Sequence, residues 1–375
     1  MARVPFAERG GALRGVVDLA TGCYPSFLFG GSLGRALPVF HFHDLTREYL
    51  EPRLQYLVEN AYRTVTCDEI ARFVIDGTSP GSRAVALTFD DAWASAWTVA
   101  TPLLKQYELK AILFAIPGRV HDGTADRSGP TTANVGVDPR VRPEDPFVTW
   151  AQLRDMHASG IWDVQSHTLS HAMIFSDSEA VGFVTPDYRH EPLLERPLTS
   201  VNGHLAFLPP EALGTPLYQR RSRMTDARRF LADEAIAERC REHVAQNGGE
   251  RFFDRPHWDR ELRAVEAKGR PDVERFESDE ARAAAIRAEL SDGRALLNTK
   301  LGSTTVRHVA LPWGIAGEST RNAVAATGHE LAFAERPLRS RVVRAGDDRH
   351  QLMRLNGKFL TCLPGRRRRW FFSTV

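Results

Sequence analysis

Two apolar runs separated by one helix constrain the fold more than any other feature of the chain. Residues 84–89 are AVALTF and residues 111–116 are AILFAI, and neither run contains a charged side chain. Residues 93–107 between them have a helical pattern, with Pro102 as the point where we expect the helix to start afresh. Continuous apolar strands joined by a helix are typical of a parallel sheet that is buried on both faces. The predicted fold class is therefore α/β.

Strands and helices continue to alternate on both sides of this block. Strands are expected at 38–44, 162–165, 306–311 and 330–334, and helices at 45–62, 68–75, 149–158 and 319–327. Thr66 is in position to cap the helix at 68–75. Residues 118–146 are rich in Gly, Pro, Asp and Thr, so we expect a long binding loop there.

The length of 375 residues allows two domains. Residues 1–37 are rich in glycine and are taken as an N-terminal extension. Residues 38–175 and 301–375 carry the α/β pattern. Residues 176–300 are polar, charged and largely helical in pattern, notably at 226–247 and 279–301, so we interpret them as a mostly helical insertion. We expect the insertion to cover the site and set substrate choice.

Charge is balanced along most of the chain but not at its end. Lys and Arg number 49 and Asp and Glu number 47. This balance excludes a protein that binds polyanions through a strongly positive net charge. Residues 336–375 nevertheless carry a net charge of +9 and include the run Arg366–Arg369, followed by Trp370. This tail predicts contact with an anionic membrane surface, or alternatively a solvated run whose aromatics pack on the domain. The sequence around Arg366–Arg369 contains no motif that is typical of nucleic-acid recognition.

The cysteines, the apolar runs and the first residues of the chain indicate the cellular compartment that we expect. The four cysteines are widely scattered without a CxxC pair, so we expect reduced thiols. No apolar run approaches the roughly 20 residues that a membrane span needs, and the first residues lack the apolar core of a secretory leader. We therefore expect a cytoplasmic protein, free or attached peripherally to the inner face of the membrane.

Two short polar stretches follow predicted strands and carry the chemistry. Asp90 and Asp91 end the strand at 84–89, where acids of a parallel α/β protein face the ligand. His167 and His171 follow the strand at 162–165, and their spacing suits two imidazoles on one face of a helical turn. Each feature alone has an ordinary explanation, a helix cap for the acids and coincidence for the histidines. Together they predict a two-histidine, one-carboxylate metal site with open positions.

The order TFDD, SHTLSH and VALPWG resembles the polysaccharide deacetylase family, also called carbohydrate esterase family 4. The start, PVFHFHDL, is similar to the family's bacterial exopolysaccharide N-deacetylase branch. The resemblance covers roughly 38–117, 147–175 and 280–335. It implies a distorted (β/α) barrel of seven or eight strands, formed by residues 38–175 and 301–375.

The resemblance also implies roles. Asp90 would be the general base, and Asp91, His167 and His171 would hold one divalent cation. Zn²⁺ suits this ligand set best, with Ni²⁺, Co²⁺, Fe²⁺ and Mn²⁺ left open. The backbone N–H of Trp313, after Pro312, would stabilise the oxyanion.

The general acid is less clearly marked. The family's C-terminal histidine motif is missing, because His350 lies in a polar loop. By resemblance to the exopolysaccharide branch, His43 becomes the candidate acid, with His41 on the same strand face; alternatively both simply line the barrel.

Three further departures concern the motifs. Ala92 replaces a usual glycine and is expected to begin the next helix. Ala310 replaces a usual arginine, whose interaction with the base must come from elsewhere or be missing. Trp313 replaces a usual tyrosine.

The leading hypothesis is a metal-dependent hydrolase that removes an acetyl or formyl group from an amino sugar. The substrate would be a free, nucleotide-linked or lipid-linked precursor of a surface polysaccharide. A sugar-binding relative without chemistry, or hydrolysis of a non-sugar amide, are the alternatives.

Overall fold

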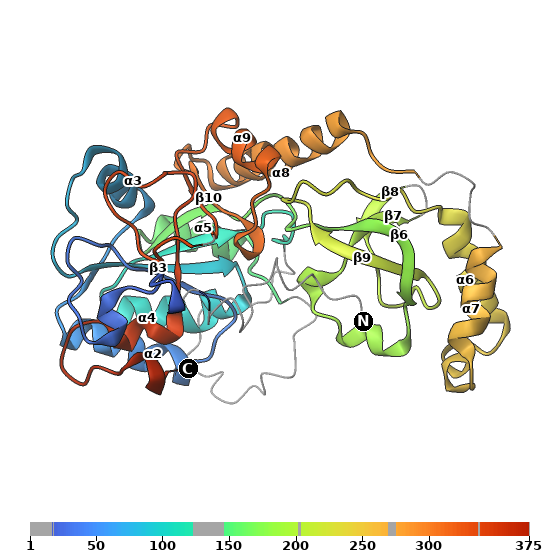
Figure 1. The fold of residues 1–375 in the computed structure, drawn as a ribbon. Helices are drawn as coiled ribbons and strands as arrows, with labels where there is room; N and C mark the ends of the chain where they lie inside the picture. Colours follow the sequence, from blue (N-terminus) through green and yellow to red (C-terminus); the bar gives the residue numbers. More distant parts are fainter. Residues whose placement is uncertain are drawn as a thin grey trace. The chain divides into compact units, whose positions relative to one another are not determined.

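The computed structural model describes residues 17, 19–122, 146–201, 204–268, 275–336 and 338–374 (Figure 1). Contacts divide the chain into two compact units. The larger unit contains Gly11–Ser170, Arg287–Ala316 and Arg321–Val375, and the smaller contains His171–Ile286 and Gly317–Thr320. The division falls inside the short segment that carries both histidines of the SHTLSH motif. The domain boundaries at 175/176 and 300/301 stay a prediction.

The larger unit is built on one parallel sheet. Among the described residues its strand order is β11-β10-β5-β4-β3-β1-β12, with β2 paired to the start of β3. The strands are β1 (Val39–Phe42), β2 (Arg63–Thr64), β3 (Ala84–Asp91), β4 (Ala111–Ala115), β5 (Trp162–Ser166), β10 (His308–Ala310), β11 (Leu331–Phe333) and β12 (Leu355–Asn356). Every pairing in it is parallel. All eight residues of β3 are buried, as expected for a strand covered on both faces.

A short C-terminal segment connects the two ends of this sheet. Leu352 forms a parallel bridge with Phe333 of β11. Three residues further along, Leu355 of β12 pairs with Phe40 of β1. The predicted distorted (β/α) barrel is therefore confirmed, and residues 352–356 are the segment that closes it.

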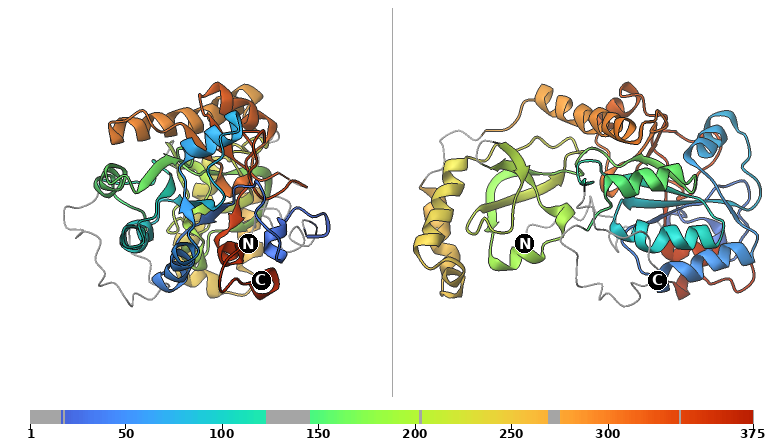
Figure 2. Two further views of the ribbon diagram at one scale, coloured as in Figure 1. Left: turned by 90° about the vertical axis from the view of Figure 1, so that its left-hand side faces the viewer. Right: turned by 180° about the vertical axis from the view of Figure 1, so that it is seen from behind.

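The helices of the larger unit agree with the predicted alternation. They are α2 (Arg47–Glu59), α3 (Cys67–Asp76), α4 (Thr101–Gln106), α5 (Trp150–Ala158) and α9 (Glu318–Ala326). Thr66 and Thr149 each form a capping box at the start of α3 and α5. The helix before Pro102 is a π-helical turn, η2 (Ala96–Ala100), and α4 starts afresh at the proline as predicted. The view from behind in Figure 2 shows α2, α4 and α5 on the outside of the sheet.

Short 3-10 turns complete the secondary structure. They are η1 (Ser26–Phe29), η3 (Pro186–His190), η4 (Leu193–Glu195), η5 (Gly249–Asp254), η6 (Pro312–Gly314), η7 (Gly357–Cys362) and η8 (Phe371–Ser373).

Alternation along the strands sorts side chains between the helices and the barrel interior. Leu87 and Phe89 of β3 belong to the cluster that includes the outer helices. Ala86 belongs to a second cluster with Phe114 and Phe333, from β4 and β11. Because side chains alternate along a strand, Thr88 and Asp90 also face the barrel interior.

The smaller unit mixes strands with helices. β6 (Met173–Phe183) pairs antiparallel with β9 (Pro216–Ser222), and β7 (Leu198–Val201) pairs with β8 (His204–Phe207). Its helices are α6 (Glu234–Gln246), α7 (Trp258–Ala267) and the start of α8 (Asp279–Leu301). The expected helix at 279–301 is confirmed. The expected helix at 226–247 begins only at Glu234, since Asp233 is its cap. The two strand pairs were not predicted, because polar strands give a weak signal.

The basic tail lies on the larger unit. Arg368 donates hydrogen bonds to the backbone carbonyls of Phe27 and Gly31, and Phe371 is buried. Arg366 and Arg369 are exposed. All four cysteines are free and buried. Among the described helices, none combines the length and apolar character needed to cross a membrane.

Candidate active site

Asp90 is held by an arginine from the closing segment. Arg354 donates two hydrogen bonds to it, from Nη1 to Oδ1 and from Nη2 to Oδ2, each 2.7 Å long. Arg354 Nη1 also donates to Thr88 Oγ1 at 3.0 Å. The guanidinium lies between the rings of Phe114 and Phe333 in the barrel interior, 5.6 and 5.8 Å from their centroids. Such a two-point contact fixes the carboxylate plane as well as its charge.

The pair keeps Asp90 ionised. Burial alone raises the pKa of Asp90, but the guanidinium of Arg354 and the nearby His167 outweigh it, and the pKa lies below its ordinary value. Sequence reasoning noted that Ala310 lacks the usual arginine. The structure supplies that contact from Arg354, 264 residues after Asp90 in the chain.

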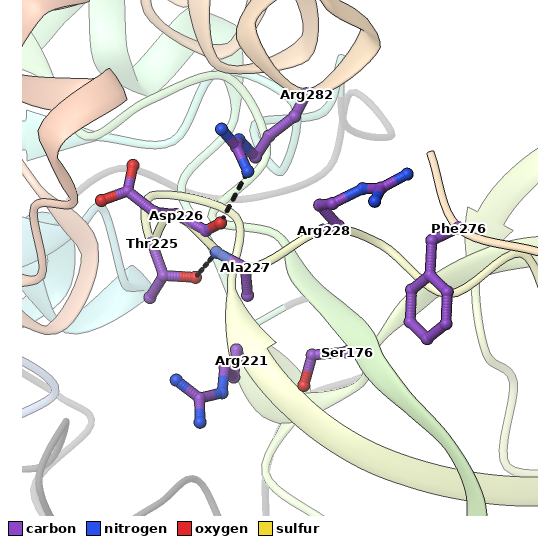
Figure 3. Close-up of a pocket in the computed structure, with 8 residues that line it drawn as sticks. All are labelled: Ser176, Arg221, Thr225, Asp226, Ala227, Arg228, Phe276 and Arg282. Atoms are coloured by element: carbon purple, nitrogen blue, oxygen red, sulfur yellow. Dashed lines mark hydrogen bonds between the residues drawn. The ribbon is translucent and has the colours of Figure 1, made fainter. Parts of the chain in front are cut away.

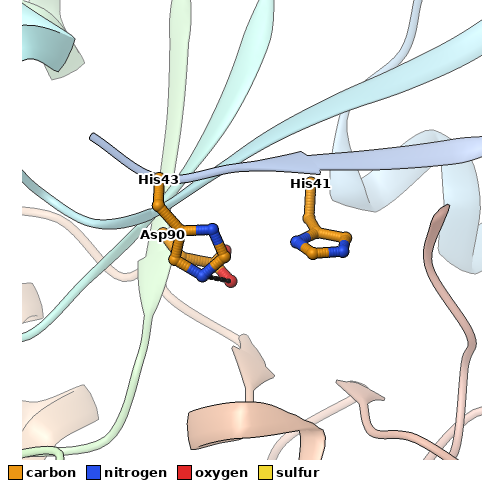
Figure 4. A group of neighbouring side chains, drawn as sticks. All are labelled: His41, His43 and Asp90. Carbon is orange, nitrogen blue, oxygen red and sulfur yellow. Dashed lines mark ion pairs between the residues drawn. The ribbon is translucent and has the colours of Figure 1, made fainter. Parts of the chain in front are cut away.

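His41 and His43 lie beside Asp90 on the same side of β1 and its extension (Figure 4). His43 Nε2 is 3.8 Å from Asp90 Oδ2, and the His43 side chain is 52% exposed. The two imidazoles meet edge to face with centroids 5.4 Å apart. Burial, followed by the charge of Arg354, lowers the pKa of His41 to about 3. His41 is therefore neutral near pH 7, whereas His43 is open to solvent.

Asp91 belongs to a second cluster. One ligand atom each of Asp91, His167 and His171 lie within 4.8 Å of one another, and all three residues are buried. Asp91 Oδ1 is 3.4 Å from His167 Nε2, and Asp91 Oδ2 accepts a hydrogen bond of 2.8 Å from Trp93 Nε1. Two imidazoles and a carboxylate at this separation suit a borderline cation such as Zn²⁺.

The backbone of β10 sets the tautomer of His167. Its Nδ1 is 2.7 Å from the carbonyl oxygen of Ala310, and a carbonyl can only accept, so Nδ1 carries the proton. Nε2 is then the atom available to a cation. Burial alone lowers the pKa of His167, but the hydrogen bond with Asp91 and the charges of Asp90 and Asp91 raise it overall. The pocket thus stabilises positive charge, as a cation site must.

The segment between the two histidines is held from two directions. On one side, the Gly118 N–H donates to the carbonyl of Leu169 at 2.8 Å. On the other, Glu289 of α8 accepts from the Leu169 N–H through its backbone oxygen at 2.8 Å. The Glu289 carboxylate also accepts from the Ser170 N–H at 2.9 Å and from the Ser170 hydroxyl. Gly293, one turn along α8, lies so close that a Cβ there would sit 2.8 Å from the Leu169 nitrogen.

The expectation of a helical turn for the two histidines is wrong. Residues 167–171 are irregular, with positive φ at Thr168 (65°) and His171 (57°). Asp91 and Ala92 also have positive φ, 74° and 61°. Ala92 therefore lies in a turn and does not begin the next helix, which also corrects that expectation. Non-glycine residues in this region store strain, which is concentrated at functional sites.

Pro312 and Trp313 follow β10, two and three residues after Ala310, whose carbonyl accepts the hydrogen bond of His167. Pro312 is buried, and Trp313 has a φ of 54° inside η6. The structure thus places this turn next to the strand that orients a metal-ligand candidate. The oxyanion role of the Trp313 N–H stays a prediction.

Sequence reasoning missed two residues at the site, Arg354 and Trp93. Trp93 stacks on Phe147 with centroids 4.7 Å apart and donates to Asp91. Within the described part of the chain, His157 and His190 belong to neither group of three potential metal ligands. Most of the expected binding loop, residues 123–145, lies outside the described residues.

Comparison with known sequences agrees with this geometry. Residues 77–188 match the family model for polysaccharide deacetylase. Poly-beta-1,6-N-acetyl-D-glucosamine N-deacetylase of Escherichia coli (strain K12) is 29% identical over 148 residues, which are 39% of this chain and 21% of that protein. YxkH of Bacillus subtilis (strain 168) is 25% identical over 146 residues, 36% of this chain and 43% of that protein. The match thus spans less than half the length of these curated relatives.

Two solved structures share the fold. A de-N-acetylase from Aggregatibacter actinomycetemcomitans has a TM-score of 0.51 at 17% identity, covering 86% of this chain and 95% of that one. The BpsB deacetylase domain from Bordetella bronchiseptica has a TM-score of 0.52 at 18% identity, covering 87% and 97%. At this identity the likeness concerns the fold alone.

Proposed function

We propose that this chain removes a small N-acyl group, acetyl or formyl, from an amino sugar, and the match of residues 77–188 to the polysaccharide deacetylase family model supports the proposal. One observation carries the proposal. The adjacent acids at the end of β3 serve two different clusters, Asp90 with Arg354 and His43, and Asp91 with His167 and His171. An amide hydrolase needs a group that takes a proton from water and a group that activates the carbonyl, and the two clusters offer one each.

Asp91, His167 and His171 would hold one divalent cation, with Zn²⁺ the first choice and Ni²⁺, Co²⁺, Fe²⁺ or Mn²⁺ as alternatives. When bound, such a cation polarises an amide carbonyl and makes water more acidic. The Ala310 carbonyl orients His167 for this role, and α8 holds the segment that carries both histidines.

The remaining residues move protons. Asp90 is ionised and fixed by Arg354, so it can accept the proton of the attacking water. His43, beside Asp90 and open to solvent, would donate a proton to the leaving amine. His41 stays neutral and supports the ring of His43. The Trp313 N–H would stabilise the negative charge that develops on the amide oxygen.

The contacts of Asp90 bear on the alternative of a sugar-binding protein without chemistry. That alternative rested on an arginine missing before Pro312 and a histidine missing near the C-terminus. Arg354 and His43 now occupy positions from which both could act. These contacts favour an enzyme over a sugar-binding protein without catalytic activity. A substrate panel is needed to test the third hypothesis, hydrolysis of a non-sugar amide.

The test is acyl release by the full chain loaded with Zn²⁺. The panel holds β-1,6-linked N-acetylglucosamine oligomers, a nucleotide-linked N-acetylamino sugar, N-formyl counterparts and N-acetyl-lysine. We expect acetate or formate release from a sugar, and a loss of about 10²–10⁴-fold in Asp90→Asn. Asp76→Asn, at the exposed end of α3, is the matched control and should keep wild-type rates. Release from N-acetyl-lysine alone, or none from any compound, would contradict the proposal.

We also propose the setting of the reaction. The substrate would be a free, nucleotide-linked or lipid-linked precursor of a surface polysaccharide on the cytoplasmic side of the membrane. The exposed Arg366, Arg367 and Arg369 would contact anionic lipid, while Arg368 holds the tail to the domain. Reversing those three charges, with Arg368 kept, should abolish sedimentation with anionic vesicles; unchanged sedimentation would refute the contact.

A further inference from the structure

A cavity of about 760 Å³ lies within the smaller unit, apart from the residues of both clusters described above (Figure 3). It is lined by Ser176, Arg221, Thr225, Asp226, Ala227, Arg228, Phe276 and Arg282. The arginines reach it from three segments, with Arg221 on β9, Arg228 in the loop after β9 and Arg282 on α8. Its volume is within the range of small-molecule sites and exceeds what a single simple anion fills.

The only carboxylate among these lining residues is already engaged. Asp226 Oδ2 accepts from the Glu318 N–H at 2.6 Å, and Oδ1 accepts from the Ser319 N–H at 2.9 Å. Burial alone raises the pKa of Asp226, but these hydrogen bonds lower it overall, so the group is an ionised cap for two backbone donors. Among the described contacts it forms no ion pair with a lining arginine, although the charge of Arg282 also lowers its pKa. With Arg228 and Arg282 against this one carboxylate, the lining has an excess of positive charge.

Neighbouring acids are paired with other arginines. Glu277 forms a buried ion pair with Arg223 at 2.5 Å. Glu191 forms one with Arg220 at 2.7 Å. The carboxylates of Glu277 and Glu191 are therefore not available to neutralise Arg228 and Arg282, which line the cavity.

Backbone carbonyls orient two of the lining guanidiniums. Arg228 Nε donates to the Glu277 carbonyl at 2.6 Å, and Arg282 Nη1 donates to the Asp226 carbonyl at 2.9 Å. A carbonyl positions a guanidinium without cancelling its charge. Among the described contacts, the ion pair of Arg282 is with Asp279, which is 69% exposed at 3.1 Å, and exposed pairs are weak.

Arg282 also carries a buried hydrogen-bond donor, its Nε–H. Its Nε is shielded from solvent and has no hydrogen-bond partner among the described residues. A buried guanidinium donor left without an acceptor is costly, so this N–H is available to an acceptor that a bound ligand would supply. Phe276 adds an apolar wall and packs on Phe230, with centroids 5.4 Å apart.

We propose that this cavity binds a phosphoryl-bearing ligand, through the guanidiniums of Arg228, Arg282 and Arg221, with Phe276 against its organic part. Planar guanidiniums match phosphate oxygens in two-point contacts, and several of them suit a multiply charged group better than a single carboxylate. Soluble nucleotides and lipid phosphates share this chemistry. The proposal rests on contacts within the smaller unit and stands whether or not the chain hydrolyses amides.

The test is binding to the full chain in two arms. Calorimetry measures uridine diphosphate, with uridine as the phosphate-free reference. Flotation measures vesicles of phosphatidylcholine with phosphatidic acid, against phosphatidylcholine alone. We expect binding in at least one arm, weakened about tenfold or more by Arg228→Glu. Binding of uridine diphosphate identifies a soluble ligand, and binding of the vesicles alone identifies a lipid phosphate.

Arg239→Glu is the matched control, because Arg239 is an exposed arginine on α6 of the same unit. It should bind like the wild type. Arg228 is itself exposed, so its reversal should lower the unfolding temperature only slightly, through the loss of its hydrogen bond to the Glu277 carbonyl. Arg282→Gln provides a second variant with the same expected loss. The proposal is overturned if neither arm shows binding, if uridine binds as tightly as its diphosphate, or if Arg228→Glu and Arg239→Glu behave alike.

Discussion

Arg354 is the residue on which the arrangement of Asp90 most depends. Its two hydrogen bonds orient a carboxylate that is only 2% exposed, and its own side chain is 11% exposed. Removing one partner of a buried ion pair leaves a charge without compensation, at a cost of about 3–5 kcal/mol. In the proposed reaction Arg354 would act through Asp90, which makes it a positioning residue.

For Arg354→Ala we expect a fall in kcat of about tenfold to a hundredfold together with a loss of stability. Arg354→Lys keeps the charge but loses the two-point geometry, so kcat should recover only in part. Steady-state kinetics and urea unfolding measure both effects. Zinc content should stay at the wild-type level, because Arg354 contacts Asp90 and not the ligand candidates. Full activity in Arg354→Ala would show that Asp90 needs no orientation.

His43 and His41 differ in environment although they share a strand face. His43 is half exposed beside Asp90, and the pKa of His41 is lowered to about 3. His43→Gln should therefore reduce kcat by about 10²-fold or more, with KM little changed. His41→Gln should reduce it far less. Equal losses in both variants, measured on the same substrate, would reject His43 as the proton donor.

At the scale of elements, α8 is the main support of the histidine segment. Alanine is a better helix former than glycine by about 1 kcal/mol, so Gly293→Ala in a free helix would raise stability. Here the added Cβ would meet the Leu169 nitrogen at 2.8 Å and the Thr168 carbonyl carbon at 3.0 Å. The backbone of the segment must shift to accept it.

We therefore expect Gly293→Ala to lower the free energy of unfolding by about 1–3 kcal/mol and to weaken zinc affinity. Urea unfolding and competition with a zinc chelator give the two values. Thr299→Ala is the control, since Thr299 is an exposed residue of the same helix and its replacement should stabilise slightly. A more stable Gly293→Ala variant with normal zinc affinity would show that α8 does not hold the segment.

The elements also show what sequence patterns can reveal. Continuous apolar runs predicted β3 and β4, because strands of a buried parallel sheet need no polar face. β12 has two residues, too few for any periodicity, so Arg354 beside it gave no signal. The missing arginine at Ala310 was the only hint that another inward-facing arginine should be sought. The spacing of His167 and His171 predicted their proximity, but the backbone path depends on Glu289 and Gly118, which are distant in sequence.

For the larger unit as a whole, buried histidines link stability to pH. His329 is 3% exposed, and burial, followed by the charge of Arg294 and the nearby His308, lowers its pKa to about 3. In the unfolded chain the same histidine takes up a proton near pH 6.5. Below that pH the unfolded state therefore binds more protons than the folded state, and stability falls as the pH decreases.

Between about pH 7 and about pH 4.5 this histidine should lower the free energy of unfolding by roughly 2 kcal/mol. In His329→Gln that part of the pH dependence should disappear, as measured by urea unfolding across the range. His190→Gln, at an exposed position, should follow the wild type. An unchanged slope in His329→Gln would mean that His329 accepts its proton in the folded state.

The central claim is that Asp91, His167 and His171 form a cation site. Zinc content by mass spectrometry of the full chain tests it most directly, on the wild type, His167→Ala and the exposed-histidine control His190→Ala. We predict about one equivalent in the wild type and in His190→Ala, and almost none in His167→Ala. A wild type that retains no divalent cation after loading, or a His167→Ala variant that retains as much as the wild type, would contradict the account.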